Sequence, residues 1–343
     1  MLRVPCSKLH DTFEAILRAA GMGAANATLC AALFTDATSD GVPSHGVNRF
    51  PAFVKSILSG QVSPDATPTL ASGFAALERY HGNSGPGPTN AHFAMARACT
   101  LAGQFGIGCV ALGFTNHWMR AGNYGWQAAE RGCIGICFTN GTPVMAPQGA
   151  HVAKLGNNPL VIAVPRPDGR HVVLDTALSQ YSWGRLKILR AAGKQADLPA
   201  GYTQEGALSN DPDAVLRSGA TLPIGHWKGA GIALLFDLVA ASLANGLASW
   251  QVAREPFDHL ISQTFIALDP RPLGSDPEAA DAIVAGILAD LHGTPPTRPG
   301  EPLLHPGERT LAAREESLRL GAPVEEAIWA QVLALPGGNG GAD

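Results

Sequence analysis

The sequence predicts an α+β fold, with helices at both ends of the chain and alternating strands and helices between them. Apolar residues recur at helical spacing near the start, for example at Leu9, Phe13 and Ile16. From about Gly73 onward, short apolar runs that are typical of strands alternate with helical segments. Helical segments return after residue 307.

The predicted elements follow in order along the chain. Residues 1–40 form two helices, and a third helix spans 51–60 with a proline at its first position. Strands are predicted at 75–80, 108–112, 134–138, 160–164, 172–174 and 264–268, and helices at 91–101, 124–131, 230–244 and 278–291. Residues 191–219 look irregular, and a Pro/Gly-rich connector at 294–307 leads into a final pair of helices.

The composition is that of a globular protein and excludes a disordered or fibrous chain. Apolar residues make up 46% of the 343 residues, a length that suggests about two domains. The 24 Lys and Arg residues stand against 28 Asp and Glu residues, for a net charge of −4. Without a basic block, we expect no nucleic-acid partner.

The sequence also predicts a protein outside membranes. Residues 1–5 lack the pattern of a signal peptide, and no apolar run reaches 18 residues. The most apolar stretch, 229–248, is interrupted by Asp237 and Asn245 and is predicted to be a buried helix. Six cysteines are few for this length, so we expect reduced thiols and a cytoplasmic protein.

The chain lacks the short motifs of the commonest nucleotide and metal sites. It has neither the G-x-x-x-x-G-K-[ST] nor the H-E-x-x-H pattern. The glycine-rich segments 21–23 and 82–87 do not show G-x-G-x-x-G spacing after a strand. This excludes the doubly wound dinucleotide-binding fold, but it does not exclude nucleotide binding.

The densest polar cluster is the run Pro43-Ser-His-Gly-Val-Asn-Arg49, which directly precedes a helix. His45 is a candidate proton donor near neutral pH. Arg49 could hold a carboxylate by a two-pronged hydrogen bond, and the helix start favours an anion. The alternative is a polar loop in which His45 only caps backbone groups.

A second cluster, at residues 115–126, follows the predicted strand 108–112 and contains Asn116 and His117. Ligands of α/β proteins tend to bind at such strand ends. The alternative is a loop whose tryptophans, Trp118 and Trp126, simply pack in the interior.

Two further segments combine a charged residue with the end of an element. Asp175 lies at the end of a predicted strand, in a segment that could offer backbone N–H groups to a phosphate. The alternative is that the Asp175 side chain only caps a helix. Lys228 lies at the positive end of the apolar helix, where an anionic partner would offset the helix dipole. The alternative for Lys228 is an exposed side chain without a ligand.

Taken together, these segments resemble the malate/L-lactate dehydrogenase family that lacks the Rossmann fold. The matching marks are Ser44-His45-Gly46 with Arg49, Asn116-His117 with Gly122 and Tyr124, Ile134-Gly135 with Thr139-Asn140, Asp175, Lys228-Gly229 and Pro306-Gly307-Glu308. Their order and spacing agree from about residue 5 to residue 332. The runs at 44–51, 116–120, 124–130 and 262–267 are similar to the branch that reduces 2,3-diketo-L-gulonate.

The resemblance implies a non-Rossmann NAD(P)-dependent oxidoreductase fold, with a sheet-containing cofactor domain and a discontinuous helical domain. The helical, substrate-side domain would comprise 1–72, about 180–230 and 306–335. The α/β cofactor-binding domain would comprise 73–179 and about 231–305. Residues 336–343 have little to bury and are expected to be a disordered tail.

The implied activity is NAD(P)H-dependent reduction of the 2-oxo group of a sugar acid such as 2,3-diketo-L-gulonate, by a homodimer. His45 would protonate the 2-oxo oxygen, and Ser44 and Arg49 would hold the carboxylate. Asn116 and His117 would line the same pocket.

Three segments would contact the cofactor. They are Leu174, Asp175, Thr176, Ala177, Leu178 and Ser179, then Trp227 and Lys228, and finally Gly307, Glu308 and Arg309. NADH is the implied cofactor, with NADPH as the alternative because Arg309 could meet a 2′-phosphate. No metal is implied.

Other substrates within the family are lactate, malate, sulfolactate and cyclic imino acids. Trp118 and Trp126 favour a larger, hydroxylated substrate, because flat aromatic faces suit sugar C–H groups. The alternative outside the enzymes is a non-catalytic protein that binds a sugar acid. Such a protein would need Arg49 but not the proton donor His45.

Overall fold

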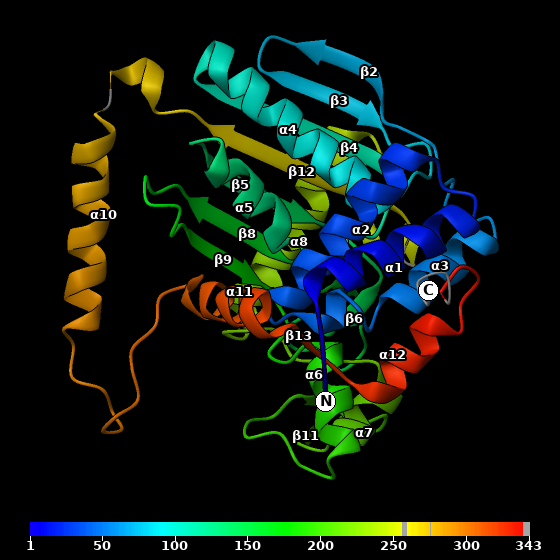
Figure 1. The fold of residues 1–343 in the computed structure, drawn as a ribbon. Coiled ribbons are helices and arrows are strands. Elements are labelled where there is room, and N and C mark those ends of the chain that lie inside the picture. The colour runs from blue at the N-terminus through cyan, green and yellow to red at the C-terminus, as the bar shows by residue number, and fades with distance from the viewer. Residues whose placement is uncertain (256–258, 275, 339–343) are drawn as a thin grey trace.

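A computed structural model describes residues 1–255, 259–274 and 276–338 (Figure 1). Its centre is a seven-stranded mixed sheet. The strands lie in the order β2 (Thr69–Phe74), β3 (Leu77–His81), β4 (Ile107–Asn116), β12 (His259–Leu268), β5 (Ile134–Thr139), β8 (Leu160–Val164) and β9 (Val172–Thr176). β3 and β4 pair in parallel, and every other neighbouring pair in this sheet is antiparallel. This confirms the predicted α+β class.

Helices cover both faces of the sheet. α4 (Gly87–Phe105) connects the parallel strands β3 and β4, and it packs on one face together with α5 (Gly122–Glu130). α8 (Trp227–Ala244) packs on the opposite face (Figure 1). The core between α4, α5 and the sheet contains fully buried Met95, Leu112 and Phe265.

A second hydrophobic core lies among helices from both ends of the chain. It is formed by α1 (Cys6–Ala19), α2 (Ala24–Ser39), α3 (Phe50–Leu58) and α12 (Glu326–Leu333). Its centre is aromatic, with the rings of Phe13 and Phe50 4.2 Å apart between centroids. β1 (Leu2–Val4) pairs with β13 (Ala322–Val324), which joins the first and last segments of the chain.

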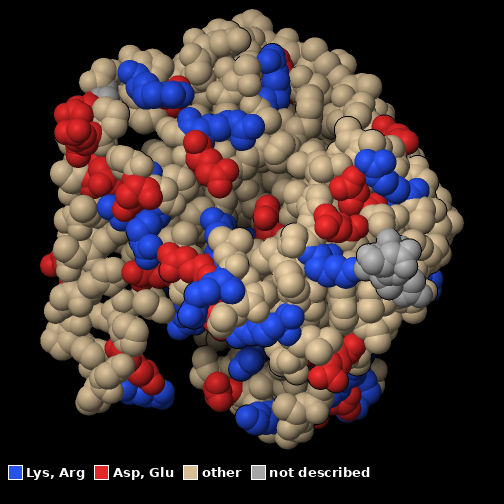
Figure 2. All heavy atoms as spheres, viewed as in Figure 1, with Lys and Arg blue, Asp and Glu red and all other residues tan. Residues whose placement is uncertain are grey.

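The other elements are short or lie at the periphery. They are β6 (Pro143–Met145), β7 (Leu155–Gly156), α6 (Trp183–Ala191), β10 (Gly201–Tyr202), β11 (Leu208–Ser209), α7 (Pro212–Ser218), α9 (Ser249–Val252), α10 (Pro277–His292) and α11 (Glu308–Leu320). None of the residues of α10 is buried. Figure 2 shows open space between this helix and the body over part of its length.

Most of the predicted helices and strands are confirmed, and the differences have physical reasons. β2 was not predicted as a strand. All six of its residues are exposed, so its sequence need not alternate between apolar and polar residues as a half-buried strand does. The stretch 191–219 is not irregular throughout, since it contains α7, which is capped by the Asp211 side chain. β4 extends past its predicted end, so Thr115 and Asn116 belong to the strand and not to a loop.

The predicted tail begins with an ordered turn. The N–H of Gly338 donates to the Leu335 carbonyl at 2.9 Å. Gly337 has a φ of 84° and lies against α1, where a Cβ would come 2.8 Å from the Ala15 carbonyl oxygen. Residues 339–343 lie outside the described residues, so the expectation of disorder stays a prediction there.

The prediction of a buried helix at 229–248 is wrong for α8. The buried residues of α8 are Gly229, Ala230, Ala233, Ala240 and Ala244. These small side chains let the helix approach the sheet closely, and they leave the leucines on the outer face. By length and a mean hydropathy of 1.4, α8 could also cross a membrane, but a single such helix is weak evidence.

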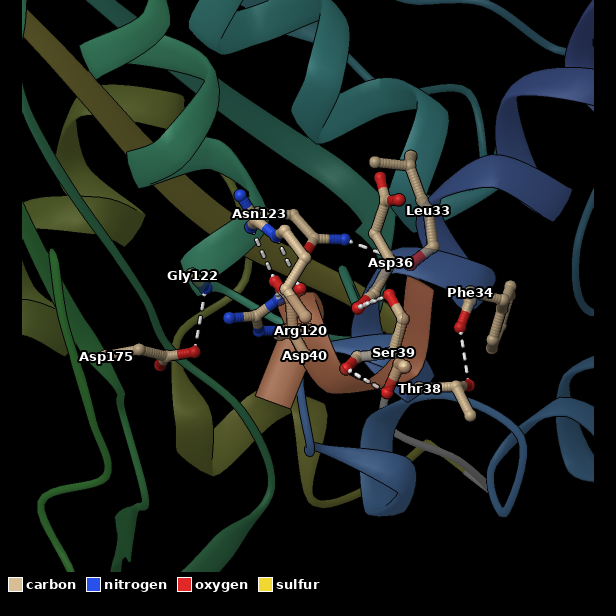
Figure 3. A network of polar contacts seen from close by, with 12 residues as sticks. Leu33, Phe34, Asp36, Thr38, Ser39, Asp40, Arg120, Gly122, Asn123 and Asp175 are labelled. Carbon is tan, nitrogen blue, oxygen red and sulfur yellow. Dashed lines mark hydrogen bonds and ion pairs between the residues drawn. The ribbon is translucent and has the colours of Figure 1, made fainter. Parts of the chain in front are cut away.

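A buried ion-pair network joins the helical core to the sheet (Figure 3). The Asp40 carboxylate, at the end of α2, accepts hydrogen bonds from Arg120 and from Arg314 on α11, the latter at 2.7 Å from both Nε and Nη2. The guanidinium of Arg314 also lies 4.5 Å from the centre of the Trp126 ring. Asp40 and Arg120 are both buried, and Arg120 depends on Asp40 for charge compensation.

Replacing Asp40→Asn should lower the free energy of unfolding by about 3–5 kcal/mol, because Arg120 would stay buried without its counter-charge. Urea unfolding measures this loss. The matched control is Asp213→Asn, which breaks an exposed pair with Arg217 and should cost less than about 1 kcal/mol. Equal losses in the two variants would contradict a stabilising role of the buried network.

Candidate active site

His45 lies in a tight turn between α2 and α3 (Figure 1). The N–H of Val47 donates to Thr38 Oγ1 at 2.9 Å, which holds the turn against the end of α2. A Cβ on Gly46 would come 2.3 Å from Thr38 Oγ1, so this close approach requires glycine. Ser44 Oγ lies 3.2 Å from His45 Nδ1, which leaves Nε2 of His45 for a ligand.

His117 follows β4 and faces His45. The two imidazole rings are nearly parallel, at 14°, with centroids 6.0 Å apart. The N–H of Met119 donates to His117 Nδ1 at 3.0 Å, so the neutral ring carries its hydrogen on Nε2. Gly87, at the start of α4, packs against this segment, and a Cβ there would lie 2.1 Å from the His117 carbonyl oxygen.

Burial and nearby cations keep both histidines neutral in the free protein. Burial lowers the pKa of His45, and Arg49 and Arg120 lower it further, whereas the Asp175 carboxylate raises it. Burial lowers the pKa of His117 well below its usual range, with added contributions from Arg49 and His45. A carboxylate bound to Arg49 would cancel part of that positive charge and raise the pKa of His45.

Arg49 lies close enough to act electrostatically on both histidines. Among the described residues, no hydrogen bond or ion pair engages its side chain, and it is exposed. Ser44 lies beside α6, where a Cβ on Gly184 would be 3.4 Å from Ser44 Cβ. The structure therefore brings a hydroxyl, two imidazoles and a guanidinium to one place.

Asp175 connects the edge strand β9 to this cluster. Its Oδ2 accepts a hydrogen bond of 2.8 Å from the N–H of Gly122, the first residue of α5 (Figure 3). The positive end of the helix dipole stabilises the carboxylate there. Asp175 also raises the pKa of His45, so it lies near the candidate acid as well as in a predicted cofactor segment.

The three predicted cofactor segments lie at the two ends of β9. At one end, the Leu178 carbonyl accepts a hydrogen bond of 2.9 Å from the N–H of Ile224. Residues 174–179 therefore lie beside the segment that leads into α8, where residues 227–228 begin the helix. At the other end, the N–H of Val173 donates to the Pro306 carbonyl at 3.1 Å, which places 307–309 there.

The side chains of these segments fit an anionic nucleotide. The Trp227 ring is 66% exposed and is followed by Lys228 in the first turn of α8. Arg309 is exposed in the first turn of α11. A cation at a helix N-terminus is unfavourable without an anion, so each of these two helix starts, at opposite ends of β9, suits a phosphate group. The buried Trp183 Nε1 has no hydrogen-bond partner among the described residues, which adds a donor beside Gly184.

Asn116 and the two tryptophans differ from their sequence interpretations. Asn116 Nδ2 donates to the carbonyls of Ser84, at 2.8 Å, and Gly85, at 2.9 Å, so its Oδ1 alone is left for a ligand. Trp118 is 1% exposed and Trp126 is 4% exposed, and both belong to the sheet core. The interpretation that they contact a sugar is wrong, and the alternative that they simply pack is correct.

Sequence reasoning missed the role of Arg120 next to the site. Arg120 lowers the pKa of His45 and anchors the segment that follows His117. A hydrogen bond of 3.1 Å from Arg120 to Asn123 Oδ1 extends this anchor into α5. The sequence feature that could have indicated this role is an arginine within a run of aromatic residues. Its partner Asp40 lies 80 positions away in the sequence, so the pairing could not be found from that run.

Comparison with known proteins agrees with this geometry. Residues 4–333 match the family model described as malate/L-lactate dehydrogenase. A relative from Pasteurella multocida (strain Pm70), named 2,3-diketo-L-gulonate reductase, is 39% identical over 335 residues, covering 97% of this chain and 100% of the relative. Malate dehydrogenase from Entamoeba histolytica shares the fold, with a TM-score of 0.92 at 22% identity over 97% of both chains.

A third similar protein is Δ1-piperideine-2-carboxylate reductase from Pseudomonas syringae pvar. tomato. Its TM-score is 0.85 at 26% identity, over 97% of this chain and 99% of that chain. The chain therefore belongs to the malate/L-lactate dehydrogenase family, as the resemblance predicted. It is an oxidoreductase that acts on hydroxy or oxo acids with a nicotinamide cofactor.

Replacing His117→Asn should make the stability of the protein less sensitive to acid. The folded pKa of His117 is lowered, so below its unfolded value of about 6.5 the unfolded chain binds more protons than the folded one. Its contribution to stability is therefore complete above about pH 6.5 and is lost as the pH falls below that value. Urea unfolding over this pH range measures the difference.

The control for this experiment is His151→Asn, because His151 is exposed. That variant should keep the pH dependence of the wild-type protein. If His117→Asn loses stability on acidification as steeply as the wild type, the buried neutral imidazole is not the cause.

Proposed function

We propose that this protein reduces the 2-oxo group of a sugar acid such as 2,3-diketo-L-gulonate with NAD(P)H, and that His45 is the proton donor. One observation carries the proposal: the His45 imidazole stacks against His117, and the charges of Arg49 and Asp175 are close enough to shift the pKa of His45 in opposite directions. The 39% identical relative named 2,3-diketo-L-gulonate reductase supports the choice of a sugar acid.

The nicotinamide cofactor supplies the hydride when it is bound. Arg49 and Ser44 bind the substrate carboxylate and so place the adjacent 2-oxo oxygen near His45. The imidazolium of His45 donates its proton from Nε2 to the oxygen that becomes the hydroxyl, and it returns to the neutral form. A positioned general acid of this kind typically contributes about 10²–10⁴ in rate.

Asp175 acts as a positioning residue for His45. The free protein favours a neutral imidazole because of burial and the cations Arg49 and Arg120. Asp175, held by the N–H of Gly122, opposes these effects and favours the charged acid. The substrate carboxylate adds to this effect, so the proton donor forms when the substrate is in place.

In this proposal the sheet-containing domain, 73–179 with about 231–305, holds the cofactor and the helical domain encloses the substrate. Residues 174–179, 227–228 and 307–309 contact the cofactor along β9. Lys228 would hold a phosphate of the cofactor at one end of β9, and Arg309 would lie toward the other end. NADH is the proposed cofactor, and NADPH is the alternative because Arg309 suits a 2′-phosphate.

The second candidate function is reduction of a different 2-oxo or 2-imino acid. The pairing of His45 with Arg49 recognises only the carboxylate and the neighbouring double bond, which malate-type and cyclic imino substrates share. The similarity to a Δ1-piperideine-2-carboxylate reductase supports this alternative. A protein that binds a sugar acid without catalysis is disfavoured, because binding does not need His45.

Replacing His45→Ala should lower kcat by about 10²–10⁴ while the protein still binds NADH, because the general acid is lost but the cofactor contacts remain. The measurement is the absorbance of reduced nicotinamide with 2,3-diketo-L-gulonate, using NADH and NADPH separately. The exposed residue His151→Ala serves as the control and should keep wild-type turnover.

Retained turnover in the His45→Ala variant would contradict the assignment of the proton donor. Wild-type protein that binds NADH but does not oxidise it with this substrate would point to the second candidate. A panel of malate, lactate, sulfolactate and cyclic imino acids, or of their oxidised forms, then identifies the substrate.

We further propose a homodimer that forms through the outer face of α8. Leu234, Leu235 and Leu238 are exposed on this helix, and Trp250 is exposed nearby in sequence. An exposed apolar patch of this kind is typical of a protein–protein interface. A second copy of the chain would bury it without a membrane, and the six free cysteines fit a reducing compartment such as the cytoplasm.

Replacing Leu235→Asp should shift the protein to monomers, because a carboxylate would be buried without a partner in the interface. Analytical ultracentrifugation measures the mass in solution. Leu208→Asp is the matched control, since Leu208 in β11 is 60% exposed and Leu235 is 59% exposed. A monomeric wild type, or an unchanged mass in the Leu235→Asp variant, would rule out this interface.

A further inference from the structure

Two histidines and a glutamate meet where α10 ends and α11 begins. His292 is the last residue of α10, Glu308 is the first residue of α11, and His305 lies in the connector between them. His292 Nε2 lies 3.3 Å from Glu308 Oε2, and His305 Nε2 lies 3.6 Å from Glu308 Oε1. All three donor atoms lie within 4.8 Å of one another.

His305 is held in the tautomer that metal binding requires. Its Nδ1 lies 3.0 Å from the Pro306 carbonyl oxygen, which can only accept, so Nδ1 carries the hydrogen. The neutral ring then directs the lone pair of Nε2 toward the Glu308 carboxylate, which is also an acceptor. Histidine ligands commonly donate their second ring nitrogen to a backbone carbonyl in this way. The His305 side chain is buried.

The Glu308 carboxylate is fixed independently of the histidine rings. Its Oε2 accepts a hydrogen bond of 2.8 Å from the backbone N–H of His305. This bond orients the carboxylate across the start of α11 and turns Oε1 toward the ring of His305. Three possible donor atoms are therefore gathered within 4.8 Å of one another.

The spacing of these donors suits a tetrahedral transition-metal ion. Bonds of about 2.0–2.2 Å to Zn²⁺ place neighbouring ligand atoms roughly 3.3–3.6 Å apart. The distances from His292 Nε2 to Glu308 Oε2, 3.3 Å, and from His305 Nε2 to Glu308 Oε1, 3.6 Å, are close to that separation, with one carboxylate oxygen facing each ring. Two imidazoles and one carboxylate favour Zn²⁺ or a similar transition metal over Mg²⁺ and Ca²⁺, which prefer oxygen ligands.

The surrounding charge tolerates a cation. The cluster lines a pocket of about 290 Å³ together with Arg166 and Arg170. Arg166 pairs with Asp281 on α10 at 2.9 Å, and Arg170 lies 3.2 Å from Glu315. Carboxylates therefore offset both arginine charges. Three protein ligands leave a fourth position in this pocket for water or for an anion.

We propose that His292, His305 and Glu308 bind one Zn²⁺ or chemically similar divalent ion, which ties the end of α10 to the start of α11. α10 has no buried residue, so packing alone does not hold it. The ion would close the connector 293–304 into a loop and fix the peripheral helix relative to the sheet. The inference rests on the geometry of these three ligands and not on the proposed reaction, although Glu308 also belongs to the predicted cofactor segment 307–309.

The test is Zn²⁺ titration of the whole protein by isothermal calorimetry after removal of metal with a chelator. The wild type should bind one Zn²⁺ per chain, and MgCl₂ should give no binding. His292→Ala and His305→Ala should each weaken Zn²⁺ binding at least about tenfold. His292 is exposed at a helix end, so its replacement leaves the fold intact. His151→Ala is the control and should bind Zn²⁺ like the wild type.

Two further readouts distinguish this site from adventitious binding. The absorption spectrum with Co²⁺ should lack thiolate charge-transfer bands, since no cysteine belongs to the cluster. Zn²⁺ should slow amide hydrogen exchange in 277–307 of the wild type but not of the His292→Ala variant. Unchanged Zn²⁺ affinity in His292→Ala, or thiolate bands with Co²⁺, would overturn the proposal.

Discussion

The ion pair between Asp40 and Arg120 is the constraint on which the arrangement of the site depends. Asp40 ends α2, the helix that carries the His45 turn, and Arg120 precedes α5, to which Asp175 is bonded. Arg314 joins the same carboxylate from α11. The helical core and the sheet form separate hydrophobic clusters, and this network is a buried polar connection between them that helps to set how His45 faces the sheet. It also explains why a buried arginine lies close to His45, the candidate proton donor.

The chemistry of the site follows from opposing effects on one imidazole. Burial, Arg49 and Arg120 favour the neutral form of His45, whereas Asp175 favours the charged form. A site balanced in this way responds strongly to one added charge, and the substrate carboxylate supplies it. In the proposed reaction Arg49 binds the substrate carboxylate, and this binding raises the pKa of His45. No carboxylate opposes the effects that lower the pKa of His117. Its imidazole therefore stays neutral and can form a hydrogen bond at the side of the site.

Helices α8 and α10 expose large apolar side chains to solvent. α8 reaches the sheet through alanine and glycine and exposes its leucines, and α10 stands off the body (Figure 2). The proposed dimer interface and the proposed ion at His292 and Glu308 involve different helices. The first buries the face of α8, and the second fixes the end of α10 where packing is lacking.

The sequence by itself determined the α+β class, most helices and the candidate acid His45, because apolar periodicity and clustered polar residues are local signals. It missed the exposed strand β2 and gave the wrong role to Trp118 and Trp126, since burial depends on distant strands. The tertiary structure alone decided the partner of Arg120 and the approach of His292 to Glu308. Those contacts join residues 80 and 16 positions apart, and no local pattern encodes which charges meet across such separations.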